Sequence, residues 1–511
     1  MLNAEASATN PSTMRAFAGA TWRNNIRLRR NAASLVSAFV IPGLFMVSFI
    51  AVFGHAASSI GFDYPLYLMA AAMFQAVMFT AGGSAMAMAV DIESGLIARL
   101  QTMPISALVT IGSRLATDLI RSLLSAGTVV LLGLLFGAQP DSAAGLLAAF
   151  LLAQGIGLVL GLASSGLALR SQHPVQTASL IQGIEMPLLM ASTAFIPVAT
   201  LPGWLQPIIT HQPFSPLIDT IRALLTGGSA WHDGDRGGWL ATRRARGRQR
   251  MGGTRISEAL MNLVNTTAIH ANRILLRWAR SRSVLIMAAA LPVVMIGLVL
   301  ILFDGMVKLF TGSSLEVLPL SLMVAVGAAF TGALMGAGSI VQERHEGLPQ
   351  RLATMPGRRS APVLGWVAAE TIRAGITVFV AFGLGLALGG RVGTLGAGLG
   401  VVAVLAVVAL AAASVGVMLG YVVNTPQGAV SFVPLVMAAM FFNTAMMPRD
   451  MYAPALRPVV DVSPITAVAE LVDGLVAGTP STTAVFAFVA WYGGLIALSG
   501  VVLVRATSPR K

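Results

Sequence analysis

The chain contains no cysteine and very little charge. Of its 511 residues, 10% are charged and 56% are hydrophobic, and the mean hydropathy is +0.80. Without cysteine there is no disulfide framework, no thiol nucleophile and no thiolate metal site. So much apolar surface exceeds what one soluble core can bury, which excludes an ordinary soluble domain and predicts an integral membrane protein.

Two kinds of enzymatic motif are also missing. The only lysines are Lys308 and Lys511, and neither is followed by Ser or Thr, so no phosphate-cradling loop ends in Lys-Ser/Thr. The six histidines are scattered, and none belongs to a His-Glu-x-x-His pair. We therefore expect no catalytic residue, no metal site and no cofactor bound by this chain.

The charge that is present is basic and lies beside apolar runs. The net charge is +13, and arginines cluster at 23–30, 243–250, 273–282, 358–359 and 505–510. No aromatic residues alternate with them in the manner of a base-stacking surface, so we expect no nucleic-acid partner. Arginines that flank apolar runs instead mark cytoplasmic ends next to membrane lipid. The near-absence of lysine and the Ala/Gly/Val richness are typical of a GC-rich bacterial genome.

Apolar runs predict an all-α fold with about 11 clear transmembrane spans. Each run is long enough for a helix to cross a bilayer, which takes about 20 residues. We expect helices near 34–54, 66–90, 108–136, 143–169 and 175–200, a short one at 216–226, then 284–303, 317–341, 362–389, 394–422, 427–446, a short one at 464–477, and 484–504. The first apolar run begins only near Ser34, so a cleaved signal peptide is not expected.

The sequence is internally duplicated. Arg99-Leu100-Gln101-Thr102-Met103-Pro104 returns as Arg351-Leu352-Ala353-Thr354-Met355-Pro356, an offset of 252 (351 minus 99). At the same offset Gly95 matches Gly347, and Arg23 matches Arg273 at 250. We interpret this as two tandem six-helix repeats: residues 1–228, an arginine- and glycine-rich linker at 229–260, and residues 261–511.

One crossing is missing from the first repeat. Its sixth span would fall where the sequence carries Arg243 to Arg250. A single arginine at the bilayer centre costs about 2.5–3.5 kcal/mol, so this row cannot cross as an ordinary helix. A degenerate or frame-shifted sixth helix explains the gap; the alternative is an inverted second half, which would break the positive-inside pattern.

Each repeat contains one polar break between its second and third spans. Acidic residues precede a glycine, then come an Arg-Leu turn and a helix-stopping proline, in Glu93 to Pro104 and in His345 to Pro356. This pattern predicts a short helix lying along the membrane surface, with one apolar face and one charged end.

These breaks resemble those of the permease subunits of type-2 ABC exporters, the family that includes daunorubicin-resistance-like drug permeases. The copy from Gly95 to Ser106 matches the family pattern well, whereas the second copy departs from it after Pro356. The proline-rich stretches Leu201 to Leu205 and Gln212 to Pro216 also look like the family's region before its last helix.

The resemblance implies that a separate ABC ATPase, present as a homodimer, binds ATP and Mg and grips the two breaks as coupling helices. Most relatives carry one unit per chain, so this chain looks like a fused pair. The residues that would couple to the ATPase are Glu93, Gly95, Arg99, Leu100, Pro104, His345, Glu346, Gly347, Arg351, Leu352 and Pro356.

A few polar residues lie inside the spans. Asp118 with Arg121, and Glu370 with Arg373, are spaced to pair on one helix face; such a pair is either a relay or a structural ion pair, and we favour the latter. Glu185, near Gln182, is a carboxylate deep in an apolar span. It faces either the transport pathway, where it would favour cationic amphiphiles, or a neighbouring helix.

The sequence therefore predicts the permease subunit of an ATP-driven exporter of hydrophobic drug-like or lipid-like molecules. It would be a multi-pass protein of the bacterial plasma membrane with both termini in the cytoplasm. An ion-gradient-driven secondary transporter is one alternative, although the repeat is parallel and no proton relay is evident. A non-transporting membrane receptor or scaffold is another.

Overall fold

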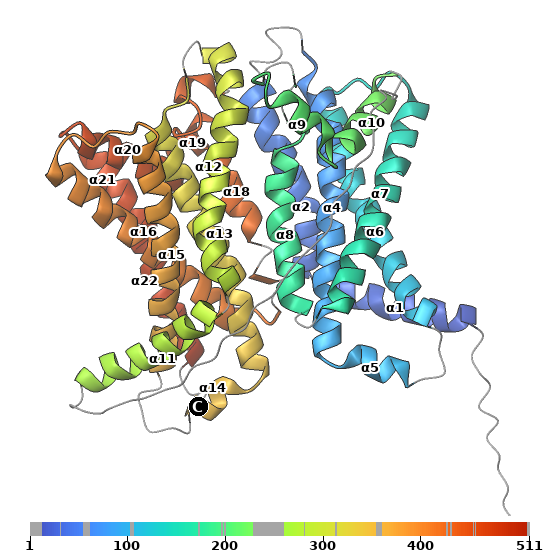
Figure 1. The fold of residues 1–511 in the computed structure, drawn as a ribbon, viewed down its shortest axis with the longest axis horizontal. Coiled ribbons are helices and arrows are strands. Elements are labelled where there is room, and N and C mark those ends of the chain that lie inside the picture. The colour runs from blue at the N-terminus through green and yellow to red at the C-terminus, as the bar shows by residue number, and fades with distance from the viewer. Residues whose placement is uncertain are drawn as a thin grey trace, which may run out of the picture.

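The structure is a computed structural model. It describes residues 13–30, 32–54, 62–102, 107–171, 174–195, 198, 201–227, 260–280, 282–311, 314–353, 360–425, 428–429, 432–452, 454 and 456–507. Across these residues every regular element is a helix (Figure 1). The expected all-α fold is confirmed.

The first half runs from a surface helix through five long apolar helices, interrupted by the short helix α5, to two short helices. Its elements are α1 (Thr13–Arg30), α2 (Ala32–Phe49) continued by η1 (Ile50–Gly54), α4 (Tyr64–Glu93), α5 (Leu96–Gln101), α6 (Ala107–Leu135), α7 (Ala143–Arg170), α8 (Pro174–Met190), α9 (Gln206–His211) and α10 (Ser215–Leu225).

The second half repeats this order and adds a last span. Its elements are α11 (Leu260–Arg280), α12 (Arg282–Thr311), α13 (Val317–His345), α14 (Leu348–Ala353), α15 (Ala361–Ala387), α16 (Leu395–Val422), α18 (Val433–Phe441), η3 (Arg449–Met451), α19 (Arg457–Asp461), α20 (Pro464–Val476), and α21 (Thr482–Phe488), η4 (Val489–Gly493) and α22 (Gly494–Thr507), which form one continuous rod.

Within the described residues, seven helices are long and apolar enough to cross a membrane, and three shorter apolar helices accompany them. Two predicted spans, 175–200 and 427–446, are cut short because polar side chains take over backbone hydrogen bonds. The Ser192 hydroxyl donates to the Leu189 carbonyl, and the Asn443 amide donates to the carbonyls of Ala439 and Met440. Side chains that replace backbone partners in this way end a helix.

Two helices escaped the sequence analysis. α1 and α11 each precede the first span of a half, and both lie across the lower face of the molecule (Figure 1). α1 packs against α6, and α11 packs against α15. Their apolar residues alternate with arginines, so they are amphipathic surface helices rather than spans.

The two halves stand side by side and meet through aromatic rings. Phe49 of α2 lies 4.5 Å from Phe441 of α18 and 6.0 Å from Phe303 of α12, measured between ring centroids. Phe45 contacts Phe441 edge-on at 5.5 Å. All four rings are buried. The contact between the halves is therefore a packed apolar seam.

The two repeats point the same way. In Figure 1 α5 and α14 both lie at the lower face, whereas α9, α10 and α20 lie toward the upper face. The second half returns to the lower face through α21 to α22. The stretch with Arg243 to Arg250, where the first half would need the same crossing, lies outside the described residues.

Candidate functional site

The two predicted surface helices form with the same geometry. A glycine with positive φ separates each from the preceding span: Gly95 has φ 71° and Gly347 has φ 73°. The Gly95 amide donates to Ile92 and the Gly347 amide donates to Arg344. One turn later the Arg99 amide donates to Gly95, and the Arg351 amide to Gly347. A left-handed glycine ends the long helix and lets the chain turn onto the lower face.

The charged side chains of both surface helices are exposed. On the surface helices these are Arg99 and Arg351, and at the ends of the spans that precede them the exposed side chains are Glu93, His345 and Glu346. Leu352 is half-buried. The side chain of Leu100, and the whole of Pro104 and Pro356, lie outside what the structure describes. The exposed set leaves a charged surface that another protein can contact.

One hydrogen bond joins the halves beside this surface. The Gln342 amide nitrogen donates to the Glu93 carboxylate at 3.2 Å. Gln342 lies one turn before α13 ends, and Glu93 is the last residue of α4. The two surface helices therefore follow spans, α4 and α13, that contact each other through this hydrogen bond.

An acidic residue anchors the base of each of these spans, and the sequence analysis missed both. Asp91 of α4 pairs with Arg114 of α6 at 2.7 Å. Glu343 matches Asp91 at the offset of 252 (343 minus 91) and binds three donors: Arg277 at 2.7 Å, the Trp366 indole at 3.1 Å and Arg273 at 3.3 Å.

Glu343 connects three elements at one point. Arg273 and Arg277 come from α11, Trp366 from α15, and Glu343 itself lies four residues before the turn at Gly347. The Arg277 guanidinium also lies 5.5 Å from the centre of the Trp366 ring. Next to this group, burial and the charge of Arg273 both lower the pKa of His270. The surface helix α11 is thereby tied to the span that carries α14.

Both candidate ion pairs lie in close contact with the preceding span. Arg121 is 3.3 Å from Asp118 and donates to the Thr80 carbonyl at 2.6 Å. The Ser84 hydroxyl donates to Asp118. In the second half Arg373 lies 2.7 Å from Glu370, and this pair is pressed onto Gly332 and Gly336.

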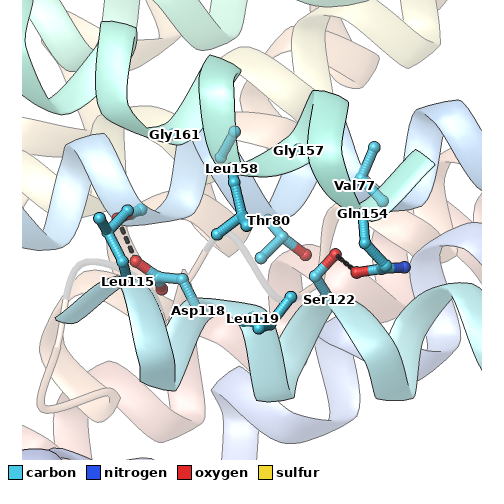
Figure 2. Close-up of a pocket in the computed structure, with 12 residues that line it drawn as sticks. Val77, Thr80, Leu115, Asp118, Leu119, Ser122, Gln154, Gly157, Leu158 and Gly161 are labelled. Carbon is cyan, nitrogen blue, oxygen red and sulfur yellow. Dashed lines mark hydrogen bonds between the residues drawn. The ribbon is translucent and has the colours of Figure 1, made fainter. Parts of the chain in front are cut away.

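The ion pair of the first half therefore makes polar contacts with α4, whereas the ion pair of the second half packs against two glycines of α13. Figure 2 shows the residues that line a small cavity between α4, α6 and α7. The volume of this cavity is about 10 Å³. Beside it Ser122 donates to Gln154 at 2.6 Å. A space of this size holds about one water molecule. The cavity is too small for a transported molecule.

Glu185 faces a neighbouring helix in this conformation. Its carboxylate lies against Gly82 of α4, as does the side chain of Gln182. Glu185 is 9% exposed, and its Oε2 has no hydrogen-bond partner among the described residues. A buried carboxylate oxygen without a donor is costly, about 1–3 kcal/mol or more.

A second cavity lies on the outside of the second half. It is an open groove of about 630 Å³ on α15 and α16, next to Ile372, Phe379 and Ala406. The first cavity lies within the first half and the second within the second half, so neither lies between the halves. No cluster of three or more potential metal ligands occurs in the described part of the chain.

Both halves match families of ABC-2 transporters. Residues 15–226 match the family described as ABC-2 type transporter, and residues 310–507 match the ABC-2 family transporter protein. A probable doxorubicin resistance ABC transporter permease, DrrC of Mycobacterium tuberculosis, is 30% identical over 246 residues, which are 47% of this chain and 87% of that protein. This chain belongs to the ABC-2 transporter permeases.

Other similar permeases also match less than half of this chain. The daunorubicin resistance ABC transporter permease protein DrrB1 of Streptomyces coeruleorubidus is 25% identical over 42% of this chain and 75% of its own length. The putative transport permease ycf38 of Cyanophora paradoxa is 26% identical over 40% of this chain and 72% of its own length. No solved structure matches. Each relative corresponds to about one half, so this permease contains two ABC-2 domains and is the multi-pass membrane subunit of an ABC exporter.

Proposed function

We propose that this permease supplies both permease units of a drug exporter, with residues 1–228 as the first unit and residues 261–511 as the second. Its cargo is a hydrophobic drug-like or lipid-like molecule, and the drug-like choice is supported by the names of DrrB1 and DrrC, which refer to daunorubicin and doxorubicin resistance. ATP and Mg are bound by a separate ABC ATPase. Both termini and the lower face lie in the cytoplasm of a bacterial plasma membrane.

Two copies of one ATPase dock on the lower face, and each grips one surface helix. The observation that carries this proposal is the matching geometry of α5 and α14, with the same positive-φ glycine and the same exposed charge on one face. Two equivalent docking elements on one chain suit a homodimeric partner, because each ATPase subunit then meets the same local shape.

Glu185 gives the cargo a charge preference. It is an acid inside the apolar helix α8, and the matching helix α18 contains none. When α4 and α8 separate during transport, its carboxylate becomes available to a cationic amphiphile.

The decisive experiment reconstitutes the permease with an ABC ATPase subunit from the same organism that co-purifies with it. Vesicles should accumulate a fluorescent hydrophobic dye only when ATP and both proteins are present. The permease alone should neither bind nor hydrolyse ATP. ATP binding by the isolated permease, or dye transport driven by a proton gradient without ATPase, would refute the proposal and favour a secondary transporter.

A further inference from the structure

Among the described residues, no element covers one apolar face of the first half, whereas α22 packs on the counterpart helix in the second half. In the second half α22 packs along α16. Met418 of α16 and Leu503 of α22 belong to one apolar cluster. On the same stripe Ala411 is 0% exposed and Ser414 is 6% exposed. At the offset of 252 the first half presents Val159, 66% exposed, and Leu162, 47% exposed.

After α10, the chain of the first half reaches the N-terminal end of α7, beside this face. The Asp141 amide, just before α7, donates to the Leu225 carbonyl at 3.0 Å, and Gly227 then turns the chain with φ 62°. The second half does the same at Gly478, φ 76°, and α21 starts at Thr482. Both halves are thus built to receive a sixth helix beside α7 or α16.

The sequence that follows Gly227 has the wrong chemistry for that place. It carries Arg243, Arg244, Arg246, Arg248 and Arg250, which cannot line an apolar helix facing lipid. No other element of the described chain packs on the stripe of Val159 and Leu162. We propose that a single apolar transmembrane helix from a separate polypeptide docks on this face of α7 and completes the six-helix unit.

The relief of the face specifies the partner. The stripe runs Gly155, Val159, Leu162, Gly166, and no atom lies within 4 Å of the space above either glycine. The matching stripe of α16 has the reverse order of sizes. Its two ends are the large residues Val407 and Met418, and its middle is formed by the small residues Ala411 and Ser414. The partner helix therefore carries small residues opposite Val159 and Leu162 and large apolar residues opposite the two glycines, since membrane helices associate through such close packing.

A second copy of this chain fits less well. Two copies in one membrane share an orientation, so a two-fold axis along the membrane normal would set Val159 against Val159 and glycine against glycine. The large side chains of the two copies would then face each other, and the space above each glycine would stay empty. The shape of the face favours a different helix.

Cysteine crosslinking in lipid tests the proposal, because the natural chain contains no cysteine. The probe is a synthetic Leu/Ala helix with lysine ends and one cysteine, carrying Ala opposite Val159 and Leu162 and Leu opposite Gly155 and Gly166. A second probe has the reverse pattern. The full-length variant Val159→Cys is placed in phosphatidylcholine/phosphatidylglycerol nanodiscs with either probe. The control variant is Val402→Cys, 42% exposed on α16.

We expect the matching probe to crosslink to Val159→Cys at least about tenfold more than the reverse probe, a ratio within the range of membrane helix packing. Adding Gly155→Leu and Gly166→Leu should abolish that difference, and both glycines have free space for the larger side chain. Equal crosslinking of Val159→Cys by the two probes would show that lipid covers this face. The same conclusion would follow if the matching probe crosslinked to Val402→Cys as strongly as to Val159→Cys. A disulfide between two Val159→Cys chains without probe would show that a second copy covers it. Either result overturns the proposal.

Discussion

At the scale of single residues, Glu343 is an acid of the lower face that has three hydrogen-bond donors. It accepts hydrogen bonds from Arg273, Arg277 and Trp366 while being almost buried itself. We expect Glu343→Gln to lower the unfolding free energy by about 2 kcal/mol, because hydrogen bonds to a charged group are lost and two arginines lose their partner. Thermal unfolding in detergent measures this loss.

Glu346→Gln is the matched control for that measurement. Glu346 is exposed on the same helix end, and an exposed charge changes stability by less than about 0.5 kcal/mol. If both variants unfold at the same temperature, the bonds of Glu343 contribute nothing to the fold.

Gly95 and Gly347 are the residues at which the backbone itself demands glycine. Their positive φ values disfavour any side chain, so Gly95→Ala and Gly347→Ala should each cost about 1 kcal/mol and reorient the surface helix that follows. We expect ATPase stimulation by the permease to fall in both variants while membrane insertion stays normal. Gly203→Ala, at an open site without positive φ, should leave stimulation unchanged; equal losses in all three variants would remove the special role of the two turns.

The exposed pair Arg449 and Asp461 makes one loop sensitive to pH. Two hydrogen bonds from Arg449, at 2.6 and 2.7 Å, hold the pKa of Asp461 below its usual value. A lowered carboxyl pKa in the folded state stabilises the loop above the ordinary pKa of aspartate, and that contribution disappears as pH falls through the lowered pKa. Proteolysis of this loop should therefore rise at low pH, and Arg449→Gln should show the higher rate already at pH 7. An identical pH profile for wild type and variant would contradict this.

At the scale of helices, glycine spacing sets how closely α13 approaches α15. A Cβ added at Gly336 would collide with the Glu370 carboxylate, and one at Gly332 would collide with the Arg373 guanidinium. Because that ion pair is buried, the side chains have little room to move away. We expect Gly336→Ala to destabilise the protein by about 1–3 kcal/mol, the usual cost of overpacking. Gly383→Ala on α15, where the space is open, should not destabilise the protein and should raise its stability by up to about 1 kcal/mol, because alanine favours a helix more than glycine does.

Most spanning helices could be predicted from the sequence because apolar length alone decides them. The expected ranges 66–90, 143–169 and 394–422 lie inside or within one residue of α4, α7 and α16. α1 and α11 were missed because arginines lower their mean hydropathy although one face remains apolar. The early ends of α8 and α18 were missed because the side chains of Ser192 and Asn443 donate hydrogen bonds to nearby backbone carbonyls, which apolar length does not reveal.

Only those parts of the candidate site that recur in both halves of the sequence could be predicted. The repeated motif located both surface helices and their glycines. It could not pair Glu343 with Arg277, because 66 residues separate them along the chain and only the packing of α11 on the second half brings them together. Nor could it orient Glu185, whose contact with Gly82 depends on the rotation of α8 against α4.

At the scale of the whole molecule, the parallel arrangement of the halves makes a prediction about sidedness. α5 and α14 lie at the same face in Figure 1, and one ATPase pair must reach both. Ser94 and Ser360 are exposed beside these helices, whereas Thr479 is exposed between α20 and α21 toward the opposite face. Cysteine at Ser94 and at Ser360 should therefore react with an impermeant thiol reagent only after cells are opened, and cysteine at Thr479 should react in intact cells. Labelling of Ser360→Cys but not Ser94→Cys in intact cells would mean that the second half is inverted in the membrane. A single ATPase pair could not then serve both surface helices, so the fused-pair mechanism would have to be given up.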